Sequence, residues 1–104
     1  MKKSSLVNII GTCSQIKRIE NMKRNKENRE KDPVNDFMIR QDQQMIDELT
    51  KELGQELLAN DWGFSEIADF IEKLRGFAYT DETEDALSTE IKKWVNEAEQ
   101  MTAA

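Results

Sequence analysis

The stretch from Trp62 to Tyr79 limits what this chain can fold into more than any other. It reads WGFSEIADFIEKLRGFAY and contains five of the seven aromatic residues in the 104-residue chain. Aromatic side chains bury large apolar areas, so they dominate the free energy that a small core gains on folding. We therefore expect a fold that buries this stretch.

The composition favours helices over strands. Glu, Lys, Gln and Leu are abundant, whereas the chain has only four glycines and one proline. These abundant residue types have good helix propensity, and the β-branched residues that strands favour form only short runs here. A chain of this length is one domain, or one domain plus an arm, and it can bury roughly two-thirds of its unfolded surface.

Hydrophobic periodicity predicts an all-α fold, a small bundle of three to four helices. Apolar residues recur at helical spacing over about 5–30, 36–59, 65–75 and 81–101. The last two helices are joined by a short link, so they are expected to form an antiparallel hairpin. The second helix would close a three-helix core over this hairpin. The first helix either completes a four-helix arrangement or reaches another chain.

Polar residues mark the expected starts of the helices. Asn, Asp, Ser and Thr side chains accept hydrogen bonds from the free N–H groups of a first helical turn. The expected cap of the second helix is Asn35 or Asp36, and that of the third helix is Ser65. The fourth helix is expected to start at Thr80 or Asp81.

Two glycines are expected to shape the chain around the third helix. Gly63 follows Asn60, Asp61 and Trp62 in a predicted turn, where a glycine can adopt positive φ. Gly76 is expected to end the third helix, since glycine is the commonest residue just after a helix.

The second helix carries carboxylates within its apolar arc. Met38, Ile39, Met45, Ile46, Leu49, Leu53 and Leu57 form this arc, and Asp42 and Glu56 lie inside it. A buried carboxylate without a partner is costly. We therefore expect the arc to be hydrated at these positions, or the carboxylates to be paired with Lys or Arg.

The charge of the chain is divided unevenly. Residues 1–32 contain nine Lys or Arg and four Asp or Glu, a net charge of +5, whereas residues 33–104 contain six and seventeen, a net charge of −11. This asymmetry predicts a basic N-terminal helix or arm over 1–32 and an acidic helical core domain over 33–104. The basic residues that could contact the phosphates of a nucleic acid are Lys17, Arg18, Lys23, Arg24, Lys26 and Arg29.

The apolar stripe of the first helix is the leading candidate for partner binding. Its members recur every three residues after Ile10, so the stripe slides around the helix. Such a stripe either wraps around a neighbour or belongs to a half-packed helix that can dock onto a partner. The candidate partner-binding residues are Leu6, Ile9, Ile10, Cys13 and Ile16. Cys13 is read first as a buried, inert thiol and second as an exposed thiol at a dimer contact.

The sequence argues against catalysis and bound metal. A single cysteine excludes an internal disulfide and a cysteine zinc cluster. The absence of histidine removes the commonest acid–base group near neutral pH and the commonest transition-metal ligand. The chain also has no nucleophile motif and no glycine-rich phosphate loop. We expect a non-enzymatic protein without cofactor or metal.

No segment predicts export or insertion into a membrane. The apolar patch Leu6–Ile10 is shorter than the roughly 7–15 residues of a signal-peptide core. No window approaches the ~20 apolar residues of a membrane span. We expect a cytoplasmic protein that does not associate with a membrane.

These observations predict a small helical protein that acts through protein–protein interaction, as an adaptor, regulator or inhibitor. Homodimerisation through the first helix is the simplest version. The alternative is a nucleic-acid-binding accessory protein that uses the basic N-terminal helix. A weaker idea is that the acidic body occupies a basic nucleic-acid-binding surface of some target.

Overall fold

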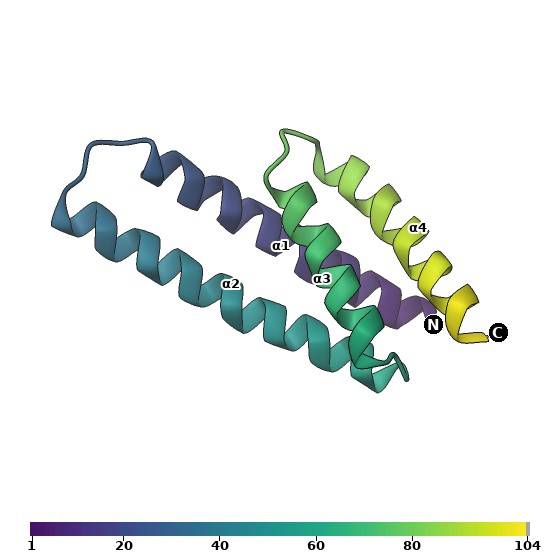
Figure 1. Cartoon of the computed structure of the whole chain (residues 1–104). Helices are drawn as coiled ribbons and strands as arrows, with labels where there is room; N and C mark the ends of the chain where they lie inside the picture. The colour runs from purple at the N-terminus through teal and green to yellow at the C-terminus, as the bar shows by residue number, and fades with distance from the viewer. Residues whose placement is uncertain (104) are drawn as a thin grey trace.

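The computed structural model describes residues 1–103, with side chains described for residues 1–100. This part of the chain forms four helices: α1 (Lys3–Glu27), α2 (Pro33–Ala59), α3 (Phe64–Ala78) and α4 (Glu84–Ala103) (Figure 1). The predicted all-α bundle is confirmed. None of the described helices is long and apolar enough to cross a membrane.

The helices are arranged around α1. α1 and α2 form a long antiparallel pair, and α3 and α4 form the predicted antiparallel hairpin. α1 contacts each of the other three helices, α2 most extensively, whereas the packing of α3 against α4 is modest. Of the two alternatives for the first helix, completion of a four-helix arrangement is confirmed, because α1 packs against the other three helices.

The α1–α2 pair is longer than the rest of the molecule. The principal extents of the chain are 52 × 23 × 22 Å. In Figure 1 the end of the pair that carries its connecting turn extends beyond α3 and α4. At that end only two helices pack together, so part of their surface has no third or fourth helix to cover it.

The core joins side chains from all four helices. Its most deeply buried members include Ile9 and Cys13 of α1, Leu53 and Leu57 of α2, Phe70 and Leu74 of α3, and Leu87 and Ile91 of α4. The core contains three edge-to-face ring pairs. The ring centroids are 5.8 Å apart for Trp62 and Phe70, 5.7 Å for Phe70 and Trp94, and 6.2 Å for Phe77 and Trp94. Such pairs contribute about 0.5–1.5 kcal/mol each beyond area burial.

The aromatic stretch is buried only in part. Trp62 and Phe70 are buried and Phe77 is half-buried, as expected, but Phe64 is 81% exposed and Tyr79 is 58% exposed. The two exposed rings lie at the two ends of α3, next to the turns. The expectation that the whole stretch is buried is therefore wrong at its ends.

The helix starts differ from those predicted. Asp32 caps α2, because its Oδ1 accepts hydrogen bonds from the backbone N–H groups of Val34 (2.8 Å) and Asn35 (3.0 Å). Pro33 stands in the first turn, where its missing N–H has no cost. Thr83 caps α4 as Asp32 caps α2: its Oγ1 accepts a hydrogen bond from the backbone N–H of Ala86 at 3.1 Å.

The two glycines also behave differently from the prediction. α3 has Gly63 at its N-cap, with φ −78° and no side-chain cap, and the positive φ of this turn belongs to Asp61 (65°). The helix continues through Gly76 to Ala78. The third helix thus starts one residue before the predicted range and ends three residues after it.

Candidate interaction surface

The fold uses the predicted partner-binding residues inside the monomer. Ile9, Cys13 and Ile16 are at most 3% exposed and belong to the core, and Leu6 and Ile10 are partly buried against it. Burial raises the pKa of the Cys13 thiol to about 12, so the thiol is neutral at physiological pH. These residues present little free surface for another chain to bind.

The sliding stripe of α1 has a structural explanation. A stripe that faces one neighbour stays on one side of the helix, but α1 packs against α2, α3 and α4. Its apolar residues must therefore be distributed around a wide arc of the helix. Of the two interpretations of the stripe, wrapping against neighbours describes this packing.

Two of the predicted nucleic-acid-binding cations instead bind the end of α3. The buried Lys17 donates from Nζ to the carbonyl of Thr80 at 2.9 Å and lies over the Phe77 ring. Arg24 donates to the carbonyl of Ala78 at 2.9 Å and lies over the Tyr79 ring. Cations are favourable at a helix C-terminus, where carbonyl groups lack intrahelical partners.

The other basic side chains of α1 also have partners, with one exception. Arg18 pairs with Glu84, Lys23 donates to Gln43 (2.7 Å) and lies 3.5 Å from Glu27, and Lys26 pairs with Asp42 at 2.6 Å. Of the six candidate cations, only the side chain of Arg29 has no hydrogen bond or ion pair within the described chain. Five of the six candidate cations are therefore bonded within their own chain, to carboxylates, a glutamine oxygen or backbone carbonyls.

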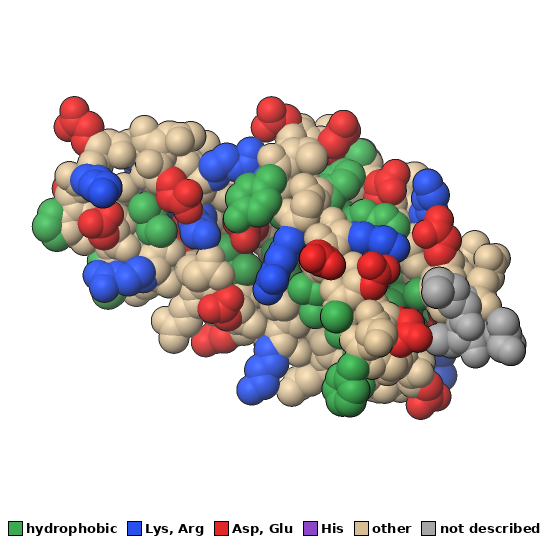
Figure 2. All heavy atoms as spheres, in the orientation of Figure 1, with side chains coloured by type: hydrophobic (Ala, Val, Ile, Leu, Met, Phe, Trp, Pro, Cys, Tyr) green, Lys and Arg blue, Asp and Glu red, His purple; other side chains and the backbone are tan. Residues whose placement is uncertain are grey.

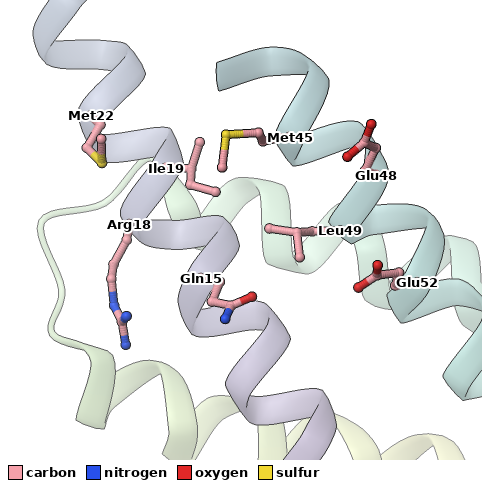
Figure 3. A pocket seen from close by; sticks show the side chains of 8 residues that line it. All are labelled: Gln15, Arg18, Ile19, Met22, Met45, Glu48, Leu49 and Glu52. Atoms are coloured by element: carbon pink, nitrogen blue, oxygen red, sulfur yellow. The ribbon is translucent and has the colours of Figure 1, made fainter. Parts of the chain in front are cut away.

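An open groove runs between α1 and α2, which we call the α1–α2 groove. Its volume is about 430 Å³. Its lining residues are Gln15, Arg18, Ile19 and Met22 from α1, and Met45, Glu48, Leu49 and Glu52 from α2 (Figure 3). In that view ribbon of the later helices lies behind α1 and α2, and the exposure of Met22 and Met45 shows that the groove is open to solvent.

The groove has an apolar floor and charged rims of opposite sign. Met22 is 51% exposed and Met45 is 49% exposed, whereas Ile19 is buried and Leu49 half-buried between them. Figure 3 shows Arg18 extending from α1 on the side away from α2. The two glutamates lie on the α2 rim.

A second depression, the α2–α3 groove, lies between Leu58 of α2 and Phe64 of α3. Its volume is about 580 Å³, and its other lining residues include Lys51, Arg75 and Asp47. Its four apolar residues, Leu58, Phe64, Ile67 and Ile71, are as many as those of the α1–α2 groove, and it contains both acidic and basic residues. On the face drawn in Figure 2, charged side chains separate the hydrophobic ones, so no continuous apolar patch forms there.

The sequence does not reveal the α1–α2 groove, because the residues that line it resemble core residues. Met45 and Leu49 lie within the apolar arc of α2, and Met22 continues the stripe of α1. Their periodicity is the same whether a third helix covers them or not. The sequence pattern alone carries no signal that separates these residues from core residues.

The α1–α2 groove is therefore the candidate functional site of this chain. Comparison with family models, curated proteins and solved structures gives no match.

Proposed function

We propose that this protein acts without catalysis, by docking onto another protein surface through the α1–α2 groove. The observation that carries the proposal is the exposure of Met22 and Met45 above a floor of Ile19 and Leu49. Removing apolar area from water contributes roughly 25 cal/mol per Å². Methionine is also flexible enough to adapt to varied partner shapes.

The groove suits the apolar face of a helical partner. Its two walls are helices, and such a face can pack against them with its polar residues near the charged rims. Arg18 on one rim and Glu48 and Glu52 on the other would select the charges that flank the apolar face of the partner. A protein that acts in this way would be an adaptor, a regulator or an inhibitor. We also propose that it is located in the cytoplasm.

The chemistry of the chain supports the non-catalytic part of the proposal. The sequence has no histidine, and its one cysteine is fully buried. The thiolate is the reactive form of cysteine, and the raised pKa of Cys13 keeps the thiol neutral.

Site-specific photo-crosslinking tests the proposal. A photoreactive amino acid replaces Met45 in the full-length chain, and a control chain carries it at Asn96, an exposed position on α4. In cells that make the protein, position 45 should give a discrete protein adduct, and Met22→Glu in the same chain should remove it. Equal labelling from both positions, or no adduct from position 45, would overturn the proposal.

A further inference from the structure

We infer that the partner seated on the α1–α2 groove is a second copy of this chain, related by a two-fold axis parallel to α1 and α2. In this arrangement α1 of each copy lies over α2 of the other. The inference rests on the proposed function of the same groove and adds the identity and orientation of the partner.

The first step is the register of the α1–α2 pair. Arg18, Ile19 and Met22 of α1 line the same groove as Met45, Glu48 and Glu52 of α2, so these residues lie along the same stretch of the antiparallel pair.

The second step is the choice between two symmetric arrangements. Two identical faces meet in an isologous contact whose two-fold axis lies in the plane of the interface. An axis across the helices would stack α1 on α1 and α2 on α2, which brings Arg18 toward its own copy and the glutamates toward theirs. Like charges brought together at an interface are unfavourable.

An axis parallel to the helices has the opposite result. It brings Arg18 of each copy to the rim that carries Glu48 and Glu52 of the other copy, and the symmetry forms this contact twice. The apolar floor is matched as well, because Met22 then faces Met45 of the second copy. Charge therefore selects this arrangement, and the apolar floors of the two copies also meet in it.

The charged groups of the rims are available for these contacts. Arg18 is 62% exposed and donates to Glu84 only through Nε, although a guanidinium carries five N–H donors. Within the described chain, Glu48 and Glu52 have no ion pair. Arg18 can therefore keep its bond to Glu84 and bind the carboxylates of a second copy.

The face is large enough for a stable dimer. A helix of 27 residues is about 40 Å long, and two helices side by side are about 20 Å wide. Their common face thus offers about 800 Å², the area that each partner contributes to an interface of standard size. Val34 (68% exposed) and Met38 (39% exposed) recur at helical spacing with Met45 and extend the apolar strip toward the end that α3 and α4 do not reach.

Cysteine crosslinking tests the orientation. Met22→Cys and Met45→Cys chains are prepared separately, and the native Cys13 is buried and should not react. With a short bismaleimide, a mixture of the two chains should give a crosslinked dimer joined between positions 22 and 45, and neither chain alone should give much product. A dominant product from the Met22→Cys chain alone would overturn the parallel axis.

Sedimentation equilibrium tests the dimer and its charges. The full chain should be mostly dimeric at about 100 μM, as a Kd in the μM range requires. Arg18→Glu should raise the Kd about tenfold or more, and adding Glu48→Arg and Glu52→Arg should restore it, because the signs are then exchanged. Glu84→Gln is the matched control: it removes only the intramolecular pair and should leave the Kd unchanged.

The outcomes separate this inference from the proposed function. A monomeric chain whose position 45 crosslinks to a different protein would overturn the second copy and keep the docking function. A chain that is monomeric and gives no adduct from position 45 would overturn both. An unchanged Kd for Arg18→Glu would overturn the charge-selected orientation.

Discussion

At the scale of single residues, the pair of Lys26 and Asp42 shows how the helices are held together by charge. The two side chains are 11% and 9% exposed, and 2.6 Å separates Nζ from Oδ2. Asn35 adds a bond from its side-chain amide to the carbonyl of Lys26 at 2.7 Å. The sequence-based expectation that Asp42 is either hydrated or paired with a cation is confirmed in its second form.

Asp42→Ala should destabilise the protein by about 3 kcal/mol, because Lys26 is left buried without its partner. Urea unfolding followed by circular dichroism measures the change. Asp47→Ala, which removes an exposed carboxylate of the same helix, is the control and should stay within about 0.5 kcal/mol. Replacing both residues of the pair, as Lys26→Met with Asp42→Leu, should restore most of the free energy of unfolding that Asp42→Ala loses. A double variant as unstable as Asp42→Ala would contradict the explanation that the unpaired buried lysine causes the loss.

Cys13 should make stability depend on alkaline pH. Its folded-state pKa of about 12 lies above the ordinary value of 9.0 because burial disfavours the thiolate. Between these values the unfolded chain loses the proton while the folded chain keeps it. The contribution of the neutral thiol to the free energy of unfolding is therefore fully present below pH 9. It is lost as pH rises toward 12, at about 1.4 kcal/mol per pH unit.

The comparison with Cys13→Ala isolates this effect. Its cavity cost does not depend on pH, so the difference between the two proteins reports the thiol alone. Between pH 8 and pH 10 the native chain should lose about 1.4 kcal/mol more than the variant in urea unfolding. Parallel pH profiles would show that the thiol is not desolvated as the structure indicates.

At the scale of the elements, α1 is the helix on which the others depend. It supplies Ile9, Cys13, Ile16 and Ile19 to the core and contacts all three remaining helices, while α3 and α4 pack only modestly on each other. Lys17 and Arg24 also donate hydrogen bonds to backbone carbonyls at the C-terminal end of α3. Without α1 the other helices would expose the faces that now pack against it.

The fragment 34–104 should therefore not fold. It should show reduced helicity in circular dichroism and no cooperative urea transition, because most of the contacts between the helices involve α1. Adding the peptide 1–32 in excess should restore part of the helical signal. A cooperative fragment would instead support the sequence-based division into an arm and an independent core domain.

The elements were predictable to different degrees. The four helices could be predicted from periodicity, because an amphipathic stripe depends only on the spacing of apolar residues within one segment of the chain. Their ends did not, because several residues near each end could cap a helix. Asp32, Asn35 and Asp36 all have suitable side chains, and it is the close approach of Asn35 to Lys26 of α1 that commits Asn35 to another bond.

At the scale of the whole molecule, the charge asymmetry has an internal explanation. The cations of α1 bind carboxylates of α2 and α4 and the carbonyls at the end of α3. A basic helix surrounded by acidic helices brings opposite charges together within the fold. The asymmetry therefore does not require a nucleic acid or any other charged partner.

The chain should accordingly show no measurable affinity for mixed-sequence DNA or RNA at about 50 mM salt, because its net charge of −6 repels phosphates and its basic side chains are engaged. Fluorescence anisotropy with labelled oligonucleotides checks this. Binding that falls steeply with salt, and that Arg29→Ala weakens, would restore the nucleic-acid hypothesis.

The sequence by itself determined the helical class, the four amphipathic segments and the need of Asp42 for a cation or water, because each depends on local spacing and on the chemistry of one side chain. Only the tertiary structure decided which apolar residues are core and which are surface. Ile16 and Met22 lie on one continuous stripe, yet Ile16 is buried among the other helices, whereas Met22 borders an open groove. The physical reason is that periodicity records which residues share a face of a helix, while burial depends on whether another helix packs against that part of the face.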